Sequence, residues 1–148
     1  MNIGHICLAP PGSEACERLV ALVEALAEHE VEQHVLVTSV TLAQRLANSK
    51  QVTVGPIVNT PVMACALMPN VDVTHVHESK SGQAGLLLTL TRSIPFVITT
   101  DGNATDDKNP LNRSVLHRAA FVIKKPYPEP DSQSARRHLS LYADALSA

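Results

Sequence analysis

The sequence has few aromatic residues and no long apolar run. Phe and Tyr make up 3% of the 148 residues and tryptophan is absent, so few side chains could stack on nucleic-acid bases. Twelve basic and 14 acidic residues give a formal net charge of −2, unlike the basic surface of a nucleic-acid binder. No apolar stretch reaches the length of a transmembrane segment. These absences exclude a nucleic-acid-binding domain and an integral membrane protein.

Cysteines are also few, and no export signal is evident. Cys7, Cys16 and Cys65 are an odd number of thiols, widely spaced and close to apolar residues. This pattern favours reduced, packed thiols over a disulfide or zinc framework. The N-terminus has no basic segment followed by a long apolar one. We therefore expect a cytoplasmic protein.

Short apolar runs alternate along the chain with segments of helical periodicity. Apolar residues make up 45% of the chain, enough for the core of one domain. Because most of the strands are apolar throughout and do not alternate, the pattern predicts a parallel sheet covered on both faces, an α/β fold with a single Rossmann-like doubly wound sheet. The predicted strands are 3–9, 34–38, 51–54, 71–77, 95–99 and 120–123. The predicted helices follow Ser13 and cover 41–47, 62–68, 81–92 and 110–117.

Three parts are expected in the chain order. Residues 1–125 form the Rossmann-like domain. Residues 126–131 have proline at every second position from Pro126, which predicts an extended linker. Residues 132–148 form a C-terminal helix packed on the same domain, with an apolar stripe made of Ala135, Leu139, Tyr142 and Leu146.

The loop after the first predicted strand offers one candidate binding segment, because ligands of such sheets bind beyond the carboxyl ends of the strands. A phosphate cradle there needs several glycines and unopposed amides. Gly12 is the one glycine present, and Glu14 and Glu17 bring negative charge to the start of the helix. Capping of the helix by Ser13 is therefore favoured over anion binding.

The segment after the fourth predicted strand offers another. His75 and His77 share one face of an extended strand and Glu78 follows, but no third ligand is evident, so we expect no metal site. His77 is interpreted as a polar contact to a ligand. Lys80 and the amides after it either hold an anion or belong to a solvated helix start. The candidate ligand-binding residues are Gly12, Ser13, His77, Glu78, Lys80, Ser81, Gly82 and Asp101.

A polar segment, 99–107, follows the fifth predicted strand and carries three carboxylates. Its spacing does not match an EF-hand, so the alternatives are a cation site, a general base or a solvated loop. The catalytic candidates are Asp101 and His77. No nucleophile elbow of the G-x-S-x-G type is present.

The order of several segments resembles the N-terminal, acceptor-side domain of GT-B glycosyltransferases of the family-4 type. The resemblance is carried by residues 10–29 with Glu17-Arg18, by Asp72-Val73-Thr74-His75-Val76-His77-Glu78, by 85–99, and by the closing helix at 139–146. In place of the catalytic histidine that many members have after the fifth strand, this chain has Asp101. The donor-binding domain of that family has no counterpart in this sequence.

The resemblance implies a half domain: a non-catalytic accessory module for binding or assembly, or one subunit of a split glycosyltransferase. Catalysis by the chain alone is then not expected, nor a cofactor of its own. A nucleotide sugar would bind only with a partner donor domain. The implied partners are a second copy, a donor-domain subunit, and a sugar or sugar-lipid acceptor. The alternative is a small Rossmann-like nucleotide- or metabolite-binding protein, or an enzyme, unrelated to sugar transfer.

Overall fold

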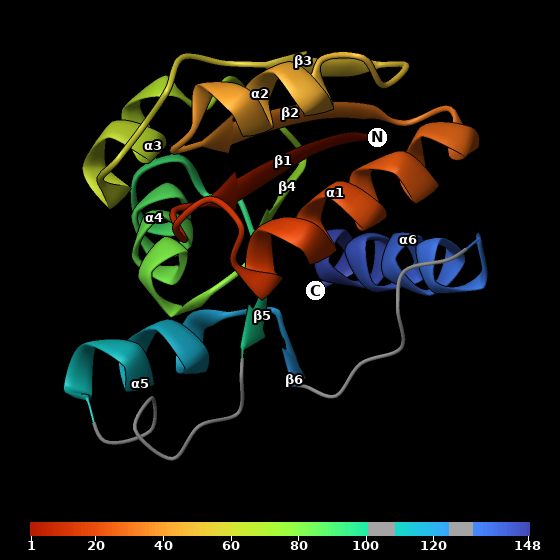
Figure 1. The fold of residues 1–148 in the computed structure, drawn as a ribbon. Coiled ribbons are helices and arrows are strands. Elements are labelled where there is room, and N and C mark those ends of the chain that lie inside the picture. Colours follow the sequence, from red (N-terminus) through yellow and green to blue (C-terminus); the bar gives the residue numbers. More distant parts are fainter. Residues whose placement is uncertain (101–108, 125–131) are drawn as a thin grey trace.

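The computed structural model describes residues 1–100, 109–124 and 132–148. Six strands of this part of the chain form one parallel sheet in the order β3-β2-β1-β4-β5-β6, the order of a Rossmann-like fold (Figure 1). The predicted fold class is therefore confirmed. The strands are Asn2–Cys7 (β1), Glu32–Val37 (β2), Val52–Val54 (β3), Val73–Val76 (β4), Phe96–Thr100 (β5) and Phe121–Lys124 (β6).

Helices cover both faces of the sheet. Helices α1, α2 and α6 pack on one face, and α3, α4 and α5 on the other (Figure 1). No helix in the described ranges has both the length and the apolar composition needed to cross a bilayer. The helices are Glu14–Leu26 (α1), continued by a 3-10 turn at Ala27–His29 (η1), Val40–Leu46 (α2), Pro61–Leu67 (α3), Ser79–Arg92 (α4), Pro110–Arg118 (α5) and Ser132–Ser147 (α6).

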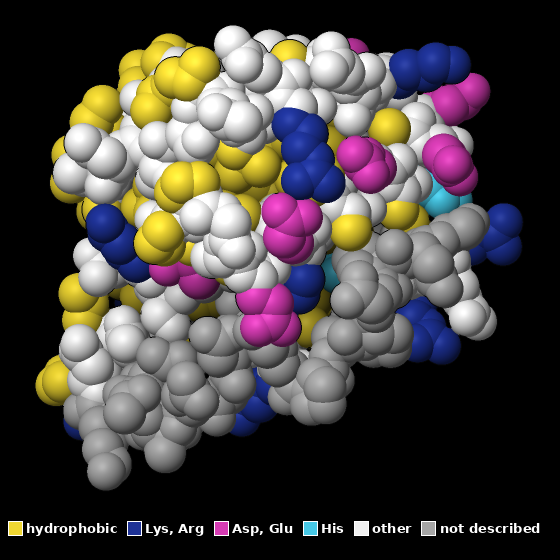
Figure 2. All heavy atoms as spheres, viewed as in Figure 1, with side chains coloured by type: hydrophobic (Ala, Val, Ile, Leu, Met, Phe, Trp, Pro, Cys, Tyr) yellow, Lys and Arg dark blue, Asp and Glu magenta, His cyan; other side chains and the backbone are white. Residues whose placement is uncertain are grey.

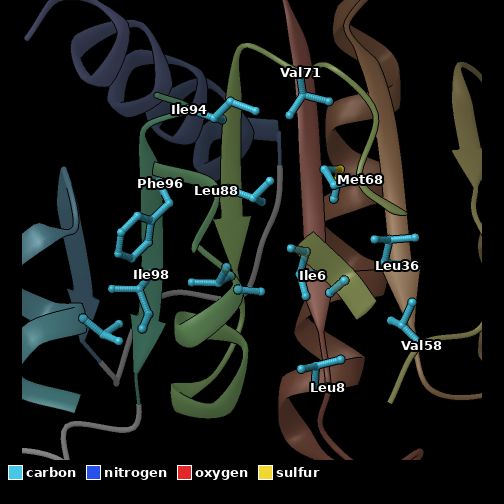
Figure 3. Packing of buried hydrophobic residues seen from close by; sticks show 14 residues of the cluster. Ile6, Leu8, Leu36, Val58, Met68, Val71, Leu88, Ile94, Phe96 and Ile98 are labelled. Atoms are coloured by element: carbon cyan, nitrogen blue, oxygen red, sulfur yellow. The ribbon is translucent and has the colours of Figure 1, made fainter. Parts of the chain in front are cut away.

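The core under α3, α4 and α5 is apolar. Figure 3 shows side chains of β1, β4 and β5, among them Ile6 and Phe96, packed together with α4. Two glycines bring α4 close to its neighbours. A Cβ at Gly85 would lie 2.7 Å from the Phe96 ring, and one at Gly82 would lie 2.6 Å from Val115 of α5. Gly82, a candidate ligand contact, therefore has a packing function in this helix.

The opposite face has two apolar clusters with polar residues between them. One cluster joins α1 and α2 to β1 and β2. The other joins α1 and α6 to β1, β4, β5 and β6. Burying polar groups is costly unless they are hydrogen-bonded, so this arrangement requires partners for each of them. The buried polar side chains on this face are His5, Gln33, His75, His77, Thr99, Ser134 and His138.

Helix α6 packs on the sheet through a stripe that differs from the predicted one. Ala135 and Tyr142 are fully buried as expected, but Leu146 is 44% exposed and Ala145 takes the inward position. The prediction of Leu146 is wrong because the stripe advances three residues from Tyr142, and not four. Residues 125–131 lie outside the described ranges, so the linker and the domain boundaries remain predictions.

Candidate functional site

The strand order reverses between β1 and β4, and the loops after these strands meet at the carboxyl edge of the sheet. Helix α1 leaves toward one face and α4 toward the other, which makes this the topological switch point where such folds bind ligands. The backbone N–H of Leu8 donates to Glu78 Oε1 at 3.2 Å and to Ser81 Oγ at 2.9 Å. The two candidate segments predicted from the sequence are therefore neighbours.

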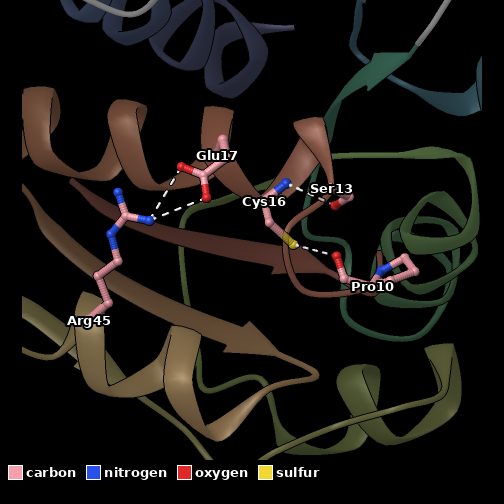
Figure 4. A network of polar contacts seen from close by, with 5 residues as sticks. All are labelled: Pro10, Ser13, Cys16, Glu17 and Arg45. Atoms are coloured by element: carbon pink, nitrogen blue, oxygen red, sulfur yellow. Dashed lines mark hydrogen bonds and ion pairs between the residues drawn. The ribbon is translucent and has the colours of Figure 1, made fainter.

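The β1–α1 loop is held by its own hydrogen bonds (Figure 4). Ser13 Oγ accepts from the Cys16 N–H at 3.3 Å, which confirms the predicted cap of α1. Pro10 O accepts from the Ser13 N–H at 3.2 Å and from the Cys16 thiol at 3.3 Å. Gly12 has a φ of +82°, and a Cβ built there would meet no atom of the described residues within 4 Å. The backbone at Gly12 is thus open to an approaching ligand.

Negative charge at the start of α1 is partly balanced. Arg45 of α2 donates to both Glu17 carboxylate oxygens at 3.3 Å (Figure 4). Both side chains are about half exposed, so the pair contributes little to stability. Its effect on a ligand is to reduce the repulsion that the Glu17 carboxylate would exert on an anion.

The β4–α4 segment is closed by the Glu78 side chain. Its carboxylate accepts from the backbone N–H of Lys80 at 2.9 Å and of Ser81 at 2.7 Å, and also from the Ser81 hydroxyl. Helix α4 therefore begins at Ser79 with Glu78 as its cap, earlier than the predicted start at Ser81. The Gly82 N–H donates to the Glu78 carbonyl. The protein's own carboxylate occupies the amides that would otherwise hold an external anion.

The Lys80 side chain, which was also predicted to contact a ligand, points to the chain itself. Its amino group donates to the backbone carbonyl of Asn59 at 3.4 Å in an exposed position. The predicted candidates on α4 are Lys80, Ser81 and Gly82, and their described contacts are all with other residues of the chain. These residues support the edge of the site, and their contact with a ligand remains a prediction.

Three histidines, His5, His75 and His77, form a buried group beneath the edge; we refer to them as the histidine cluster. His5 lies on β1 directly beside His75 on β4 in the parallel register, and His77 follows His75 on the same face. None is more than 3% exposed. The His75 and His77 rings are stacked, with their centroids 4.1 Å apart. The sequence predicted the shared face of His75 and His77 but did not identify His5.

Hydrogen bonds set the protonation of two of these rings. The Gln33 amide donates to the Val23 carbonyl at 3.0 Å, so its oxygen faces His5 and accepts from His5 Nε2 at 3.0 Å. With its proton on Nε2, His5 has a lone pair on Nδ1, which accepts from His77 Nε2 at 3.1 Å. The Val23 carbonyl of α1 thereby determines, through Gln33 and His5, which nitrogen of His77 carries the proton at the carboxyl edge of the sheet.

His75 is held between the sheet and α6. Its Nδ1 is 2.7 Å from the Tyr142 hydroxyl and its Nε2 is 2.8 Å from the Thr99 hydroxyl, so both ring nitrogens are satisfied. His138 of α6 stacks on the His75 ring with the centroids 5.7 Å apart, and its Nδ1 donates to the Ser134 carbonyl at 2.8 Å. These contacts explain why α6 carries polar residues on its inward face.

Burial keeps the histidine cluster neutral. It lowers the pKa of His5 to about 3, and it lowers the pKa values of His75 and His77 well below 6.5. Electrostatic repulsion between the rings of the cluster, and then from His138 and Arg18, adds to this effect on the pKa values of His75 and His77. Burial also raises the pKa of Cys7, whose sulfur lies 3.8 Å from that of Cys16, so this thiol is a poor nucleophile.

The structure brings the predicted candidates Gly12, Ser13, His77 and Glu78 to one edge of the sheet. Asp101 lies outside the described residues and remains a predicted catalytic candidate. The functional side chains that sequence reasoning missed come from other elements: His5, Gln33, Thr99, His138 and Tyr142. A lone histidine in the middle of an apolar strand was the available signal for His5, since a buried histidine needs a partner.

Comparisons with known proteins support the fold. No protein-family model matches the chain, and no curated protein matches its sequence. Among solved structures, a dodecameric FMN-dependent UbiX-like decarboxylase from Escherichia coli O157:H7 is similar, with a TM-score of 0.53 over 99% of this chain and 92% of that chain. The two sequences are 16% identical, so the likeness establishes a shared fold alone.

This comparison overturns the expected resemblance to GT-B glycosyltransferases, and with it the expectation of half a sugar-transfer enzyme. The similar chain is nearly covered by this one and is a decarboxylase. The segments that carried the resemblance are buried strands, each followed by a turn and a helix, which Rossmann-like chains share whatever their function. The expectation of no cofactor is wrong on the same finding, because the similar protein depends on FMN.

The neutral histidine cluster predicts a loss of stability in acid. Below pH 6.5 the histidines of the unfolded chain bind protons, whereas the buried histidines of the folded chain stay neutral. The free energy of unfolding therefore falls as the pH is lowered from about 6.5 to 3. For His5 alone this lowers the free energy of unfolding by roughly 2 kcal/mol at about pH 5, and His75 and His77 act in the same direction. We expect cooperative unfolding near that pH, measured by circular dichroism and urea titration. A His117→Ala variant, exposed on α5, should keep the same profile, and a flat stability between pH 7 and 5 would contradict the assignment.

The Glu78 cap predicts a second effect. Replacing Glu78 by Ala removes the acceptor for the first amides of α4, so the free energy of unfolding should fall by about 1 to 2 kcal/mol. The same variant frees those amides, and added sulfate should stabilise it more than the native chain. Glu24→Ala, at an exposed position in α1, is the matched control for loss of one carboxylate. Equal sulfate effects in all three proteins would refute the occupied-amide interpretation.

Proposed function

We propose that this chain is a small Rossmann-like binding protein that holds a flavin mononucleotide at the carboxyl edge of β1 and β4, and that it has no part in sugar transfer. The observation that carries the proposal is the open backbone at Gly12, on the loop after β1, at the switch point of the sheet where β4 ends next to the buried His77 in the sequence. The fold shared with an FMN-dependent decarboxylase supports the choice of ligand.

The phosphate of the ligand fits one of the two helix starts at this edge. At α4 it would meet the Glu78 carboxylate, which already holds the available amides. At α1 the lack of a side chain on Gly12 lets a phosphate approach the backbone. Arg18, one turn into α1 and close enough to His75 and His77 to lower their pKa values, adds positive charge at this end. The residues therefore fit a phosphate on the α1 side.

The ring of the ligand needs a polar contact, and His77 is the candidate. Its Nε2–H is engaged with His5, which makes Nδ1 a hydrogen-bond acceptor. Because burial keeps this imidazole neutral at physiological pH, it offers an acceptor without a charge. When bound, a flavin supplies a redox-active ring; the chain's residues bind and orient it. A catalytic function of His77 or Asp101 remains a prediction.

We also infer that copies of this chain associate through α3 and the adjoining part of α4. Apolar side chains gather on the surface where Figure 1 places α3 (Figure 2). Val62 is 69% exposed and Leu90 is 59% exposed, while Ile57, Met63 and Leu67 are each about two-fifths exposed. Exposed apolar groups of this kind favour a protein interface.

The expected location is the cytoplasm, where thiols such as those of Cys7 and Cys16 stay reduced.

Flavin binding is tested by titrating the purified chain into FMN and into riboflavin and following flavin fluorescence. The native chain should bind both, and FMN more tightly because of its phosphate. Gly12→Asp and Gly12→Asn place side chains of the same shape at a position where both residues tolerate a positive φ. Asp should weaken FMN binding about 10-fold relative to Asn, through charge repulsion, and leave riboflavin binding nearly unchanged.

If these two Gly12 variants bind FMN equally well, the phosphate of FMN does not lie at the Gly12 loop. If the native chain binds neither flavin but binds another nucleotide in the same assay, that nucleotide replaces FMN as the proposed ligand. Failure of every ligand would refute a binding function at this edge.

Self-association is tested by sedimentation or by light scattering over a range of concentrations. The native chain should form oligomers, and Val62→Lys with Leu90→Lys should shift it toward monomer, because two charges replace apolar contacts. Val40→Lys, at a site on α2 that is 59% exposed, is the control for an added surface charge. A native chain that stays monomeric at high concentration would contradict the inference.

A further inference from the structure

Three imidazole nitrogens converge beneath the carboxyl edge of the sheet. His5, His75 and His77 each offer one ring nitrogen, and these atoms all lie within 4.8 Å of one another. The parallel register brings His5 and His75 side by side, and the two-residue period of the strand places His77 on the same face. The cluster is buried from solvent, so no exposed ligand set is involved.

The separation of two of these nitrogens suits a tetrahedral ion. His5 Nδ1 and His77 Nε2 are 3.1 Å apart. A zinc ion with metal–nitrogen bonds of about 2.0 to 2.1 Å holds adjacent tetrahedral ligands roughly 3.3 to 3.4 Å apart. An ion could therefore take the place of the shared proton between His5 and His77 after a shift of a few tenths of an ångström.

Partners outside the cluster orient two of the rings as in histidine metal sites. The His5 Nε2–H donates to Gln33, which is itself held by the Val23 carbonyl, and this directs the lone pair of Nδ1 into the cluster. His75 has a hydroxyl partner on each side, Thr99 and Tyr142. Turning one of its nitrogens toward an ion breaks one of these bonds, and the other remains to anchor the ring.

We propose that His5, His75 and His77 form a binding site for a divalent transition-metal ion of the zinc type. The ligands are neutral imidazoles without carboxylate or thiolate, a set that suits zinc and copper and not magnesium or calcium.

The proton balance of binding is simple. The proton on His77 Nε2 moves to Nδ1 of the same ring, Nε2 then binds the ion, and His5 keeps its proton on Nε2. All three rings stay neutral, so binding from the neutral state releases no net proton. Arg18, whose charge already acts on His75 and His77, opposes a second cation nearby. We therefore expect this site to bind the ion more weakly than a structural zinc site does.

The test uses the chelator-treated full chain, titrated with Co²⁺ near neutral pH and followed by visible absorption. Tetrahedral cobalt absorbs strongly, so we expect an intense band that saturates at one equivalent and disappears when Zn²⁺ is added. His5→Ala and His77→Ala should weaken binding at least 100-fold, whereas His117→Ala, which removes an exposed imidazole on α5, should bind as the native chain does.

A second measurement covers the case in which these variants do not fold. Nitrogen-15 spectra of the native imidazoles should show that Zn²⁺ shifts the ring signals of the histidine cluster and leaves that of His117 in place. Absence of both the cobalt band and the zinc-induced shifts would overturn the proposal, as would unchanged affinity in a folded His77→Ala variant. Because these metal titrations contain no flavin, failure to bind the metal leaves the proposed flavin-binding function standing.

Discussion

The buried histidine cluster and its partners determine how the helices on one face of this sheet can pack. Imidazoles in an apolar core are tolerated only with hydrogen bonds on their nitrogens, and here the bonds come from three directions. Gln33 on β2 connects the cluster to the backbone of α1, Thr99 connects it to β5, and Tyr142 connects it to α6. A shift of α6 along its axis would break the contact with His75. The position of α6 is therefore set by polar geometry as well as by apolar contact.

The same arrangement shapes the chemistry available at the ligand edge. Glu78 satisfies the first amides of α4 with its own carboxylate, which leaves the α1 side for an anionic group. His77 enters this edge as a neutral ring whose tautomer is determined through His5 and Gln33. A ligand that carries a phosphate at one end and hydrogen-bonding groups at the other matches this division.

Much of the fold could be predicted from the sequence, because the strands are mostly apolar and alternate with segments of helical periodicity. Ser13 as the cap of α1 was predictable for the same local reason. The differences arise from contacts between distant segments. Helix α4 begins two residues before the predicted start because the carboxylate of Glu78 caps it and also reaches the amide of Leu8, 70 residues away. Leu146 is exposed because the buried stripe of α6 advances three residues from Tyr142, to Ala145.

The site was less predictable. His75 and His77 are two residues apart, so their shared face follows from the strand period, but His5 joins them only through the parallel register of β1 and β4. His5 and His77 are separated by 72 positions in the chain. Motif matching also erred, since the turn-and-strand pattern that resembled glycosyltransferases belongs to the fold and not to a family.

The account depends on neutral, hydrogen-bonded imidazoles with defined tautomers. The most direct measurement is a long-range proton–nitrogen correlation spectrum of the histidine rings at neutral pH, in which the two ring nitrogens show where the proton resides. The account predicts His5 and His77 both neutral with the proton on Nε2, and a His5 that remains neutral in mild acid. Charged rings at neutral pH, or a His5 with its proton on Nδ1, would contradict it.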